Sequence, residues 1–156
     1  MQKTNAMRIL DNAKIKYSTY TYDCGDGHID GVSVANKLGQ DIKMVFKTLV
    51  AQGHSKEIYV FVIPVNEELN LKKAAKVAGE KNVQMIHVKD INKYTGYIRG
   101  GCSPVGMKKL YKTFIHESAK NLEKFIFSGG KIGTQIEANP ENILNLISAK
   151  YEDLIM

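Results

Sequence analysis

Apolar and polar positions follow one another along this chain in short stretches, some with the period of a helix and others with that of a strand. In the first half, a stretch near the N-terminus has helical spacing, and later stretches alternate as strands do. The elements expected there are a helix that begins at Thr4 or Asn5, a strand over residues 17–22, a helix that Ser33 caps and Gly39 ends, and strands over 45–51 and 57–65. The last of these strands is apolar almost throughout, which indicates burial on both faces.

The second half of the chain predicts more strands than helices. The elements expected there are a helix that Asn70 caps and Gly79 ends, a strand over 83–88, a helical turn over 90–94, strands over 113–116, 124–127 and 132–137, and a final helix from Asn139 and Pro140 whose buried side Tyr151 and Leu154 could extend. The last two strands flank a glycine turn and predict a hairpin. Because short strands outnumber β-α-β units, we expect an α+β fold with a mixed, largely antiparallel, barrel-like sheet and helices packed around it. No repeat divides the chain, so residues 1–156 are expected to form a single domain.

One lysine interrupts the apolar pattern of the strand over 45–51. Period-2 alternation places Lys47 on the same face as Val45, Leu49 and Ala51. A buried ammonium needs a partner or a water-filled cavity. Lys47 therefore either extends its charge into solvent from an edge strand, or lies at the mouth of a pocket where it offers donors to a ligand.

The stretch from Tyr94 to Gly106 contains four glycines and a proline among thirteen residues. Such a stretch is a loop whose backbone adopts conformations that side chains would forbid. Its exposed amides could hold an anion or a carbonyl oxygen, or the stretch could simply be a tight turn between strands. It matches neither the phosphate-binding P-loop pattern nor the dinucleotide-binding pattern.

Composition and charge narrow the class of protein. An apolar fraction of 44% and a charged fraction of 24% in 156 residues are those of an ordinary globular domain. The formal net charge of +6 favours a polyanionic partner, and lysines gather at 72–76 and 108–112. No apolar run approaches the roughly 20 residues that span a bilayer, and no secretory signal begins the chain, so we expect a cytoplasmic protein without a membrane partner. Two cysteines and four scattered histidines give no metal-binding spacing, and no metal or cofactor is expected.

Four short motifs together resemble the YbaK/EbsC family of free-standing aminoacyl-tRNA deacylases, which is related to the editing domain inserted in bacterial prolyl-tRNA synthetases. The motifs are Phe46-Lys47-Thr48-Leu49, Thr95-Gly96-Tyr97, Gly100-Gly101-Cys102-Ser103-Pro104-Val105-Gly106 and Ser128-Gly129-Gly130. The resemblance covers essentially the whole chain. It implies hydrolysis of the ester of a mischarged tRNA, with Cys-tRNA(Pro) as the usual substrate of the YbaK branch. It also implies the 3′ end of tRNA(Pro) as a partner, with prolyl-tRNA synthetase as a second partner.

The resemblance also implies which residues form the site. The essential lysine of the family falls on Lys47, and its glycine loop falls on 100–106, so that Lys47, Gly101 and Ser103 are the expected catalytic residues. The expected substrate-binding residues are Tyr22, Phe46, Thr48, Gly100, Cys102, Pro104, Gly106, Gly129 and Gln135. The last departs from the family, in which this position is often acidic, or histidine in the inserted domains. Glutamine cannot act as a base, which counts against any mechanism that needs a carboxylate there.

No Ser-His-Asp set can be assembled from this sequence. We expect Lys47 to bind the terminal adenosine or its phosphate, and the amides of residues 100–103 to hold the ester carbonyl. Water or the substrate's own thiol would then attack. The alternatives are a nucleophilic Cys102, a deacylase for another small amino acid such as alanine, and a module that binds RNA or a nucleotide without turnover.

Overall fold

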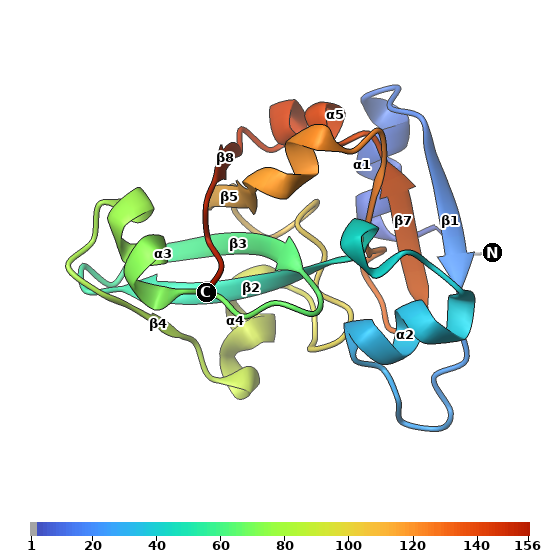
Figure 1. Ribbon diagram of the computed structural model, residues 1–156, viewed down its shortest axis with the longest axis horizontal. Coiled ribbons are helices and arrows are strands. Elements are labelled where there is room, and N and C mark those ends of the chain that lie inside the picture. Colours follow the sequence, from blue (N-terminus) through green and yellow to red (C-terminus); the bar gives the residue numbers. More distant parts are fainter. Residues whose placement is uncertain (1–2) are drawn as a thin grey trace.

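Five α-helices and eight β-strands follow one another in the computed structural model, which describes residues 3–156 (Figure 1). They are α1 (Asn5–Asn12), β1 (Tyr17–Thr21), α2 (Gly31–Leu38), β2 (Phe46–Gly53), β3 (Ile58–Pro64), α3 (Leu71–Ala78), β4 (Val83–Met85), α4 (Ile91–Thr95), β5 (Lys112–His116), β6 (Phe125–Ser128), β7 (Thr134–Ala138), α5 (Pro140–Leu146) and β8 (Lys150–Glu152). Short 3₁₀ helices lie at Ile42–Met44, Val88–Asp90 and Glu117–Asn121. None of the helices between residues 3 and 156 has the length and apolar character needed to cross a membrane.

The strands form two sheets. One has the order β1-β7-β6 and the other the order β4-β2-β3-β5-β8. All neighbouring strands are antiparallel except that β5 runs parallel to both β3 and β8. A single bridge between Val45 and Ile126 joins the sheets where β2 begins. The expected α+β class and mixed, largely antiparallel pairing are confirmed, while the described strands close no barrel.

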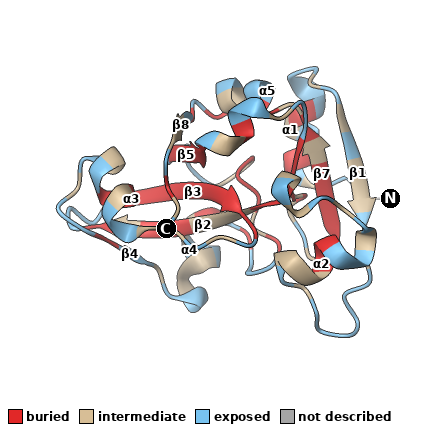
Figure 2. Cartoon of the chain, in the orientation of Figure 1, coloured by how far each residue is buried: buried red, intermediate tan, exposed pale blue. Residues whose placement is uncertain are grey.

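The core lies on both faces of β3, whose seven residues are all buried (Figure 2). Val60 and Val62 pack with α1 and the small sheet, whereas Phe61 and Ile63 pack with α3. The predicted burial of this strand on both faces is confirmed. The residues of β2 divide between the same two groups: Phe46 packs with α1 and the small sheet, and Ala51 packs with α3.

Helix boundaries agree with the sequence where a side chain caps the helix, with one exception. The hydroxyl of Thr4 accepts the amide of Met7 and caps α1, as predicted. At α2 the cap is Asp30 and not Ser33, because the Asp30 carboxylate accepts both the amide and the hydroxyl of Ser33. Aspartate caps a helix as effectively as serine, so composition alone did not separate the two.

Two predicted elements near sheet edges were wrong in extent. β4 ends at Met85 because the chain turns into the 3₁₀ helix Val88–Asp90. α5 ends at Leu146, and Ser148 has a φ of 54°, which a continuing right-handed helix cannot contain. The following residues form β8, which pairs with β5 instead of extending the helix.

The carboxylate of Glu80 fastens the β2–β3 hairpin to the segment after α3. Its Oε2 accepts the hydroxyls of Ser55 and Tyr59, each at 2.5 Å, and its Oε1 accepts the amide of Ser55 at 3.0 Å. These hydrogen bonds, from Ser55 first and then Tyr59, lower the pKa of Glu80 from 4.5 to about 2. In the unfolded chain the carboxyl takes up its proton at higher pH. The stabilisation is therefore complete above pH 4.5 and is lost as the pH falls toward 2.

We therefore expect Glu80→Gln to lower the thermal unfolding midpoint at neutral pH and to flatten its decline in acid, as measured by circular dichroism at a series of pH values. Glu57→Gln, at an exposed carboxylate of the same hairpin, serves as the control and should keep the wild-type acid dependence. If the unfolding midpoint of Glu80→Gln still fell in acid as steeply as that of wild type, the acid dependence would come from other carboxylates.

Candidate active site

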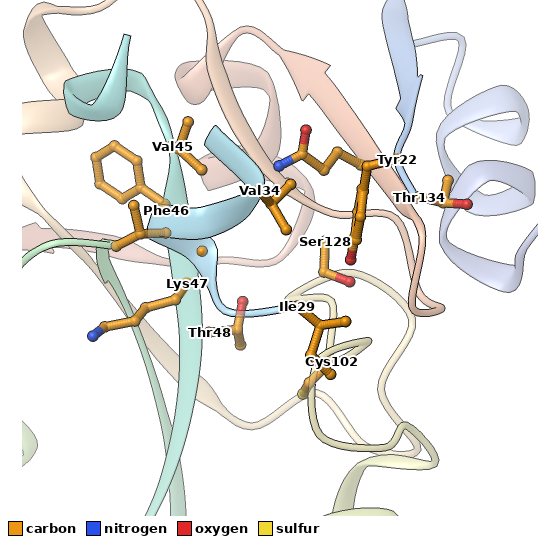
Figure 3. A pocket seen from close by; sticks show the side chains of 14 residues that line it. Tyr22, Ile29, Val34, Val45, Phe46, Lys47, Thr48, Cys102, Ser128 and Thr134 are labelled. Atoms are coloured by element: carbon orange, nitrogen blue, oxygen red, sulfur yellow. The ribbon is translucent and has the colours of Figure 1, made fainter. Parts of the chain in front are cut away.

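A cavity of about 130 Å³ lies between the small sheet, β2, α2 and the glycine loop of residues 94–106 (Figure 3). Its lining residues are Tyr22, Ile29, Gly31, Val34, Val45, Phe46, Lys47, Thr48, Val65, Gly100, Cys102, Ser128, Thr134 and Gln135. Sites for drug-sized ligands have volumes of roughly 300–1,000 Å³. This cavity therefore suits a group of the size of an amino-acid side chain rather than a whole nucleotide.

Lys47 is the cation of this lining, and it is half-buried. Burial lowers the pKa of its ammonium, and the charges of Glu68 and Glu67 oppose that effect. No hydrogen bond or ion pair engages the ammonium within residues 3–156. In Figure 3 its nitrogen points away from Thr48 and Cys102, so the aliphatic stem borders the cavity while the charge faces outward. Both sequence interpretations of Lys47, a charge extended into solvent and a lysine at the mouth of a pocket, share this placement.

Two residues of the glycine loop that line the cavity have backbone amides without partners among the described residues. Gly100 and Cys102 both line it, and their amides donate no hydrogen bond to any residue from 3 to 156. The amide of Gly101 is engaged, because it donates to the carbonyl of Ile98 at 3.0 Å. A Cβ at Gly101 would lie 2.9 Å from the backbone nitrogen of Ile132, so glycine is needed there for close packing against the β6–β7 turn. The amides that remain for an oxyanion are those of Gly100 and Cys102.

The loop is held in place by its own polar groups. Ser103 is fully buried, and its hydroxyl accepts the amide of Val105 at 3.3 Å. The hydroxyl of Tyr97 donates to the carbonyl of Val105 at 2.6 Å. Gly106 has a φ of 86° and lies against that hydroxyl. These contacts fix the conformation of residues 97–106 and thereby the position of the two free amides.

The polar residues on the opposite wall offer no base. Gln135 is buried, and its Oε1 accepts the amide group of Gln40 at 2.7 Å. The hydroxyl of Thr48 is buried without a hydrogen-bond partner among the described residues. The lining contains no aspartate, glutamate or histidine. Burial raises the pKa of the Cys102 thiol to about 11, so this thiol is protonated at neutral pH and is a poor nucleophile.

Metal chemistry finds no support in the same region, since no group of three or more His, Cys, Asp or Glu side chains within residues 3–156 could hold an ion. The site therefore offers one cation, two backbone amides and several hydroxyl and amide groups. Such a set can bind and orient an ester and stabilise its oxyanion.

Comparison with known proteins identifies the family. The model of the aminoacyl-tRNA editing domain matches residues 30–146. This chain belongs to the aminoacyl-tRNA editing domain family. Among its relatives is a protein of Enterococcus faecalis named "Putative Cys-tRNA(Pro)/Cys-tRNA(Cys) deacylase EbsC", which is 46% identical over 153 residues, 98% of this chain and 93% of the relative.

Two further matches are to part of a proline–tRNA ligase and to a solved structure. The proline–tRNA ligase of Thermosipho melanesiensis is 32% identical over 98 residues, which are 63% of this chain and 17% of the ligase. A crystal structure titled as "a putative trans-editing enzyme for prolyl tRNA synthetase" has a TM-score of 0.82 at 21% identity and covers 100% of this chain and 99% of that one. At that identity the structural match establishes the fold.

The structure divides the residues that the sequence predicted for the site of this editing domain. Those that line the cavity are Tyr22, Phe46, Lys47, Thr48, Gly100, Cys102 and Gln135. Those outside the lining are Gly101, Ser103, Pro104, Gly106 and Gly129, of which Pro104 and Gly106 line a different hollow. Gly129, for example, accepts the hydroxyl of Thr4 through its carbonyl and donates its amide to Thr134.

Sequence reasoning missed the wall that α2 contributes and two polar residues of the small sheet. The missed lining residues are Ile29, Gly31, Val34, Val45, Val65, Ser128 and Thr134. Ser128 carried a signal, because it opens the Ser-Gly-Gly motif of the hairpin turn. Gly31 carried no signal that could be interpreted from the sequence alone. A Cβ at Gly31 would lie 2.3 Å from the side chain of Val65, so glycine lets α2 pack against that residue.

Proposed function

We propose that this chain removes the amino acid from mischarged tRNA, with Cys-tRNA(Pro) as its substrate, in the cytoplasm and alongside prolyl-tRNA synthetase. The observation that carries the proposal is a cavity that Lys47 lines together with Gly100 and Cys102, whose amides have no partner among the described residues, and that no aspartate, glutamate or histidine lines. The near full-length relative named as a Cys-tRNA deacylase supports the choice of substrate. The match to part of a proline–tRNA ligase supports the choice of partner.

The geometry suggests how the substrate is divided between the cavity and its mouth. A volume of about 130 Å³ accommodates the cysteinyl group, whereas the terminal adenosine remains outside. The ammonium of Lys47 faces outward and binds the adenosine or its phosphate there. The ester carbonyl then lies at the entrance, where the amides of Gly100 and Cys102 can donate to its oxygen.

The absence of a base within the cavity favours an attack by the substrate itself. In this step the cysteinyl sulfur forms a bond to the ester carbonyl carbon, and the bond from that carbon to the ribose oxygen breaks. The thiol proton ends on the ribose hydroxyl, and the released thiolactone is opened by water. Because the sulfur is tethered to the carbonyl, the reaction avoids much of the entropic cost of a bimolecular attack. The protein supplies orientation and oxyanion stabilisation.

Replacing Cys102 by alanine is expected to leave at least about half of the deacylation rate, because its buried thiol is protonated and its amide, which is the proposed donor, is retained. Cys24→Ala, at the other free cysteine, which is exposed, serves as the matched control and should behave like wild type. The measurement is the single-turnover rate of ester loss from labelled Cys-tRNA(Pro). A loss of activity in folded Cys102→Ala, with Cys24→Ala unaffected, would instead assign the nucleophile to the enzyme.

A panel of cysteinyl-, alanyl-, prolyl- and seryl-tRNA(Pro) tests the substrate most broadly. We expect cysteine to be released fastest and proline to be retained. Preference for alanine would make the chain a deacylase for a different small amino acid, and would contradict the role of the substrate thiol.

A further inference from the structure

The cations near the glycine loop are distributed unevenly around the cavity. Residues 91–116 contain five lysines and arginines and no aspartate or glutamate. The loop before α2 contains the exposed carboxylates Asp23, Asp26 and Asp30, of which Asp26 is paired with Lys37 at 2.8 Å, so the loop keeps a net negative charge. A polyanion that enters the cavity therefore meets attraction on one side and repulsion on the other.

Four exposed cations surround the glycine loop, and we call them the basic rim: Lys93, Arg99, Lys108 and Lys131. Lys108 joins the loop to α4, since its ammonium donates to the carbonyl of Lys93 at 3.3 Å and its backbone amide donates to Thr95. Arg99 directly precedes Gly100, which lines the cavity. Lys131 lies on the β6–β7 turn, and its Cα is 2.9 Å from the position of a Cβ on Gly101.

No carboxylate among the described residues pairs with the basic rim, and the ammonium of Lys93 lies over the ring of Tyr94, 5.1 Å from its centroid. The ion pairs among residues 3–156 involve Lys3, Lys37 and Lys73, and none involves a member of the rim. In Figure 1 the chain that follows α4 runs between α4 and α2, and Lys93 belongs to α4, on the side of that chain away from α2. Gly100 lies close to Ile29 of the acidic loop (residues 23–30), because a Cβ built on Gly100 would be 3.0 Å from Cδ1 of Ile29. The glycine loop and the acidic loop therefore meet at these two residues.

We propose that the basic rim binds the sugar-phosphate backbone of the tRNA acceptor stem. The stem then leaves the cavity over α4 and the glycine loop, and away from the acidic loop of residues 23–30. Arg99, next to the cavity, contacts the single-stranded 3′ end, and Lys93 and Lys108 contact the stem beyond it. This inference rests on the proposed function, because it takes the substrate of the cavity to be an aminoacyl-tRNA.

The other lysine clusters fit this partner less well. Lys109 and Lys112 border two different hollows of the surface and do not accompany Lys108. Lys72 and Lys76 are exposed on α3. This helix packs on one face of the large sheet, whereas α1 and the small sheet pack on the other. Lys72 and Lys76 provide a matched control with the same number of charges.

The test compares Lys93→Gln/Lys108→Gln with Lys72→Gln/Lys76→Gln. Glutamine keeps part of each aliphatic stem and removes one charge per site. Binding of fluorescent, uncharged tRNA(Pro) is measured between about 50 and 200 mM salt, where the attraction to phosphates dominates. We expect the rim variant to bind about tenfold or more weakly, and its slope of log affinity against log salt to fall by roughly 2, about 1 for each phosphate that the variant no longer neutralises. The α3 variant should bind within about twofold of wild type.

A second readout separates this inference from the proposed function. Cysteine esterified to a CCA trinucleotide has no stem, so the rim variant should cleave it at the wild-type rate while its KM for full-length Cys-tRNA(Pro) rises. If wild type cleaves neither ester, the proposed function fails, and the binding comparison still decides the role of the rim. Equal weakening by both double variants, or greater weakening by the α3 variant, would overturn the inference. Should the double variant fail to fold, Lys93→Gln provides the same comparison at a single exposed stem-contacting site, with an expected fall in slope of roughly 1.

Discussion

Replacing Lys47 by alanine is expected to slow the release of cysteine from Cys-tRNA(Pro) by about 100-fold or more, because the site loses a preorganised cation. Within the described residues 3–156, Lys47 is the one cation that lines the cavity. Its ammonium faces outward, toward the place proposed for the terminal adenosine. The fold should be retained, because removal of a half-buried ammonium also removes the cost of its desolvation. The measurement is single-turnover ester loss together with thermal unfolding.

The matched control is Lys43→Ala, which removes an exposed lysine in the 3₁₀ helix that precedes β2. This variant should deacylate at the wild-type rate. If folded Lys47→Ala also does so, the lysine serves only the surface of the strand, and the cavity is not the place where the ester is cleaved. If both variants lose activity equally, the effect comes from net charge and not from the position of Lys47.

The second large effect is expected on the side of the substrate. Ser-tRNA(Pro) should be hydrolysed roughly 100-fold or more slowly than Cys-tRNA(Pro), because a few per cent of a thiol is ionised at neutral pH whereas a hydroxyl is not. The two esters differ by one atom and fit the same cavity of about 130 Å³. A difference in rate at saturation therefore reports the attacking group and not the fit. The measurement is the single-turnover rate for each ester at saturating enzyme.

Equal rates for the two esters would contradict an attack by the substrate thiol and would leave water as the nucleophile. In that case the candidates for positioning the water are the unpartnered hydroxyl of Thr48 and the amide group of Gln135. Thr48→Val, which removes the hydroxyl and keeps the shape, would then slow both substrates alike. Under the thiol mechanism, Thr48→Val should not slow the release of cysteine, because no positioned water takes part in that step.

The site could be predicted in part because some of its residues conflict with their local pattern. Lys47 stands out as a charge within an apolar strand, and the glycines of 100–106 stand out as a loop that forbids side chains. The structure gives each conflict a physical reason. Lys47 lies at the cavity mouth, and Gly101 lies so close to the backbone of Lys131 and Ile132 that a Cβ would not fit.

The remaining parts of the site depend on contacts between distant segments. Val34 and Ile29 are ordinary apolar residues in the sequence, and they become a cavity wall only because Gly31 lets α2 approach Val65. In the same way, the sequence presents Gln135 as a departure from its family, and only the structure pairs it with Gln40. The local sequence pattern does not predict contacts between residues so far apart in the chain.

At the edge of the large sheet, too, contacts between distant segments decide a structure that the local sequence does not predict. The apolar spacing around Tyr151 fits a helix, but Ser148 reverses the backbone and the next residues pair in parallel with β5. A strand as short as β8 has too few residues to show a period of its own, so tertiary pairing decides its structure. The central strands β2 and β3 are longer and more apolar, and their position was predictable for that reason.

The most direct test of the account is the rate at which the wild-type chain removes cysteine from Cys-tRNA(Pro) in a single turnover with excess enzyme. We expect ester loss at least about 100-fold faster than spontaneous hydrolysis in the same buffer, and loss of this acceleration in Lys47→Ala. Tight binding of Cys-tRNA(Pro) with ester loss at the spontaneous rate would contradict the account, and would make the chain a module that holds the tRNA end without cleaving it.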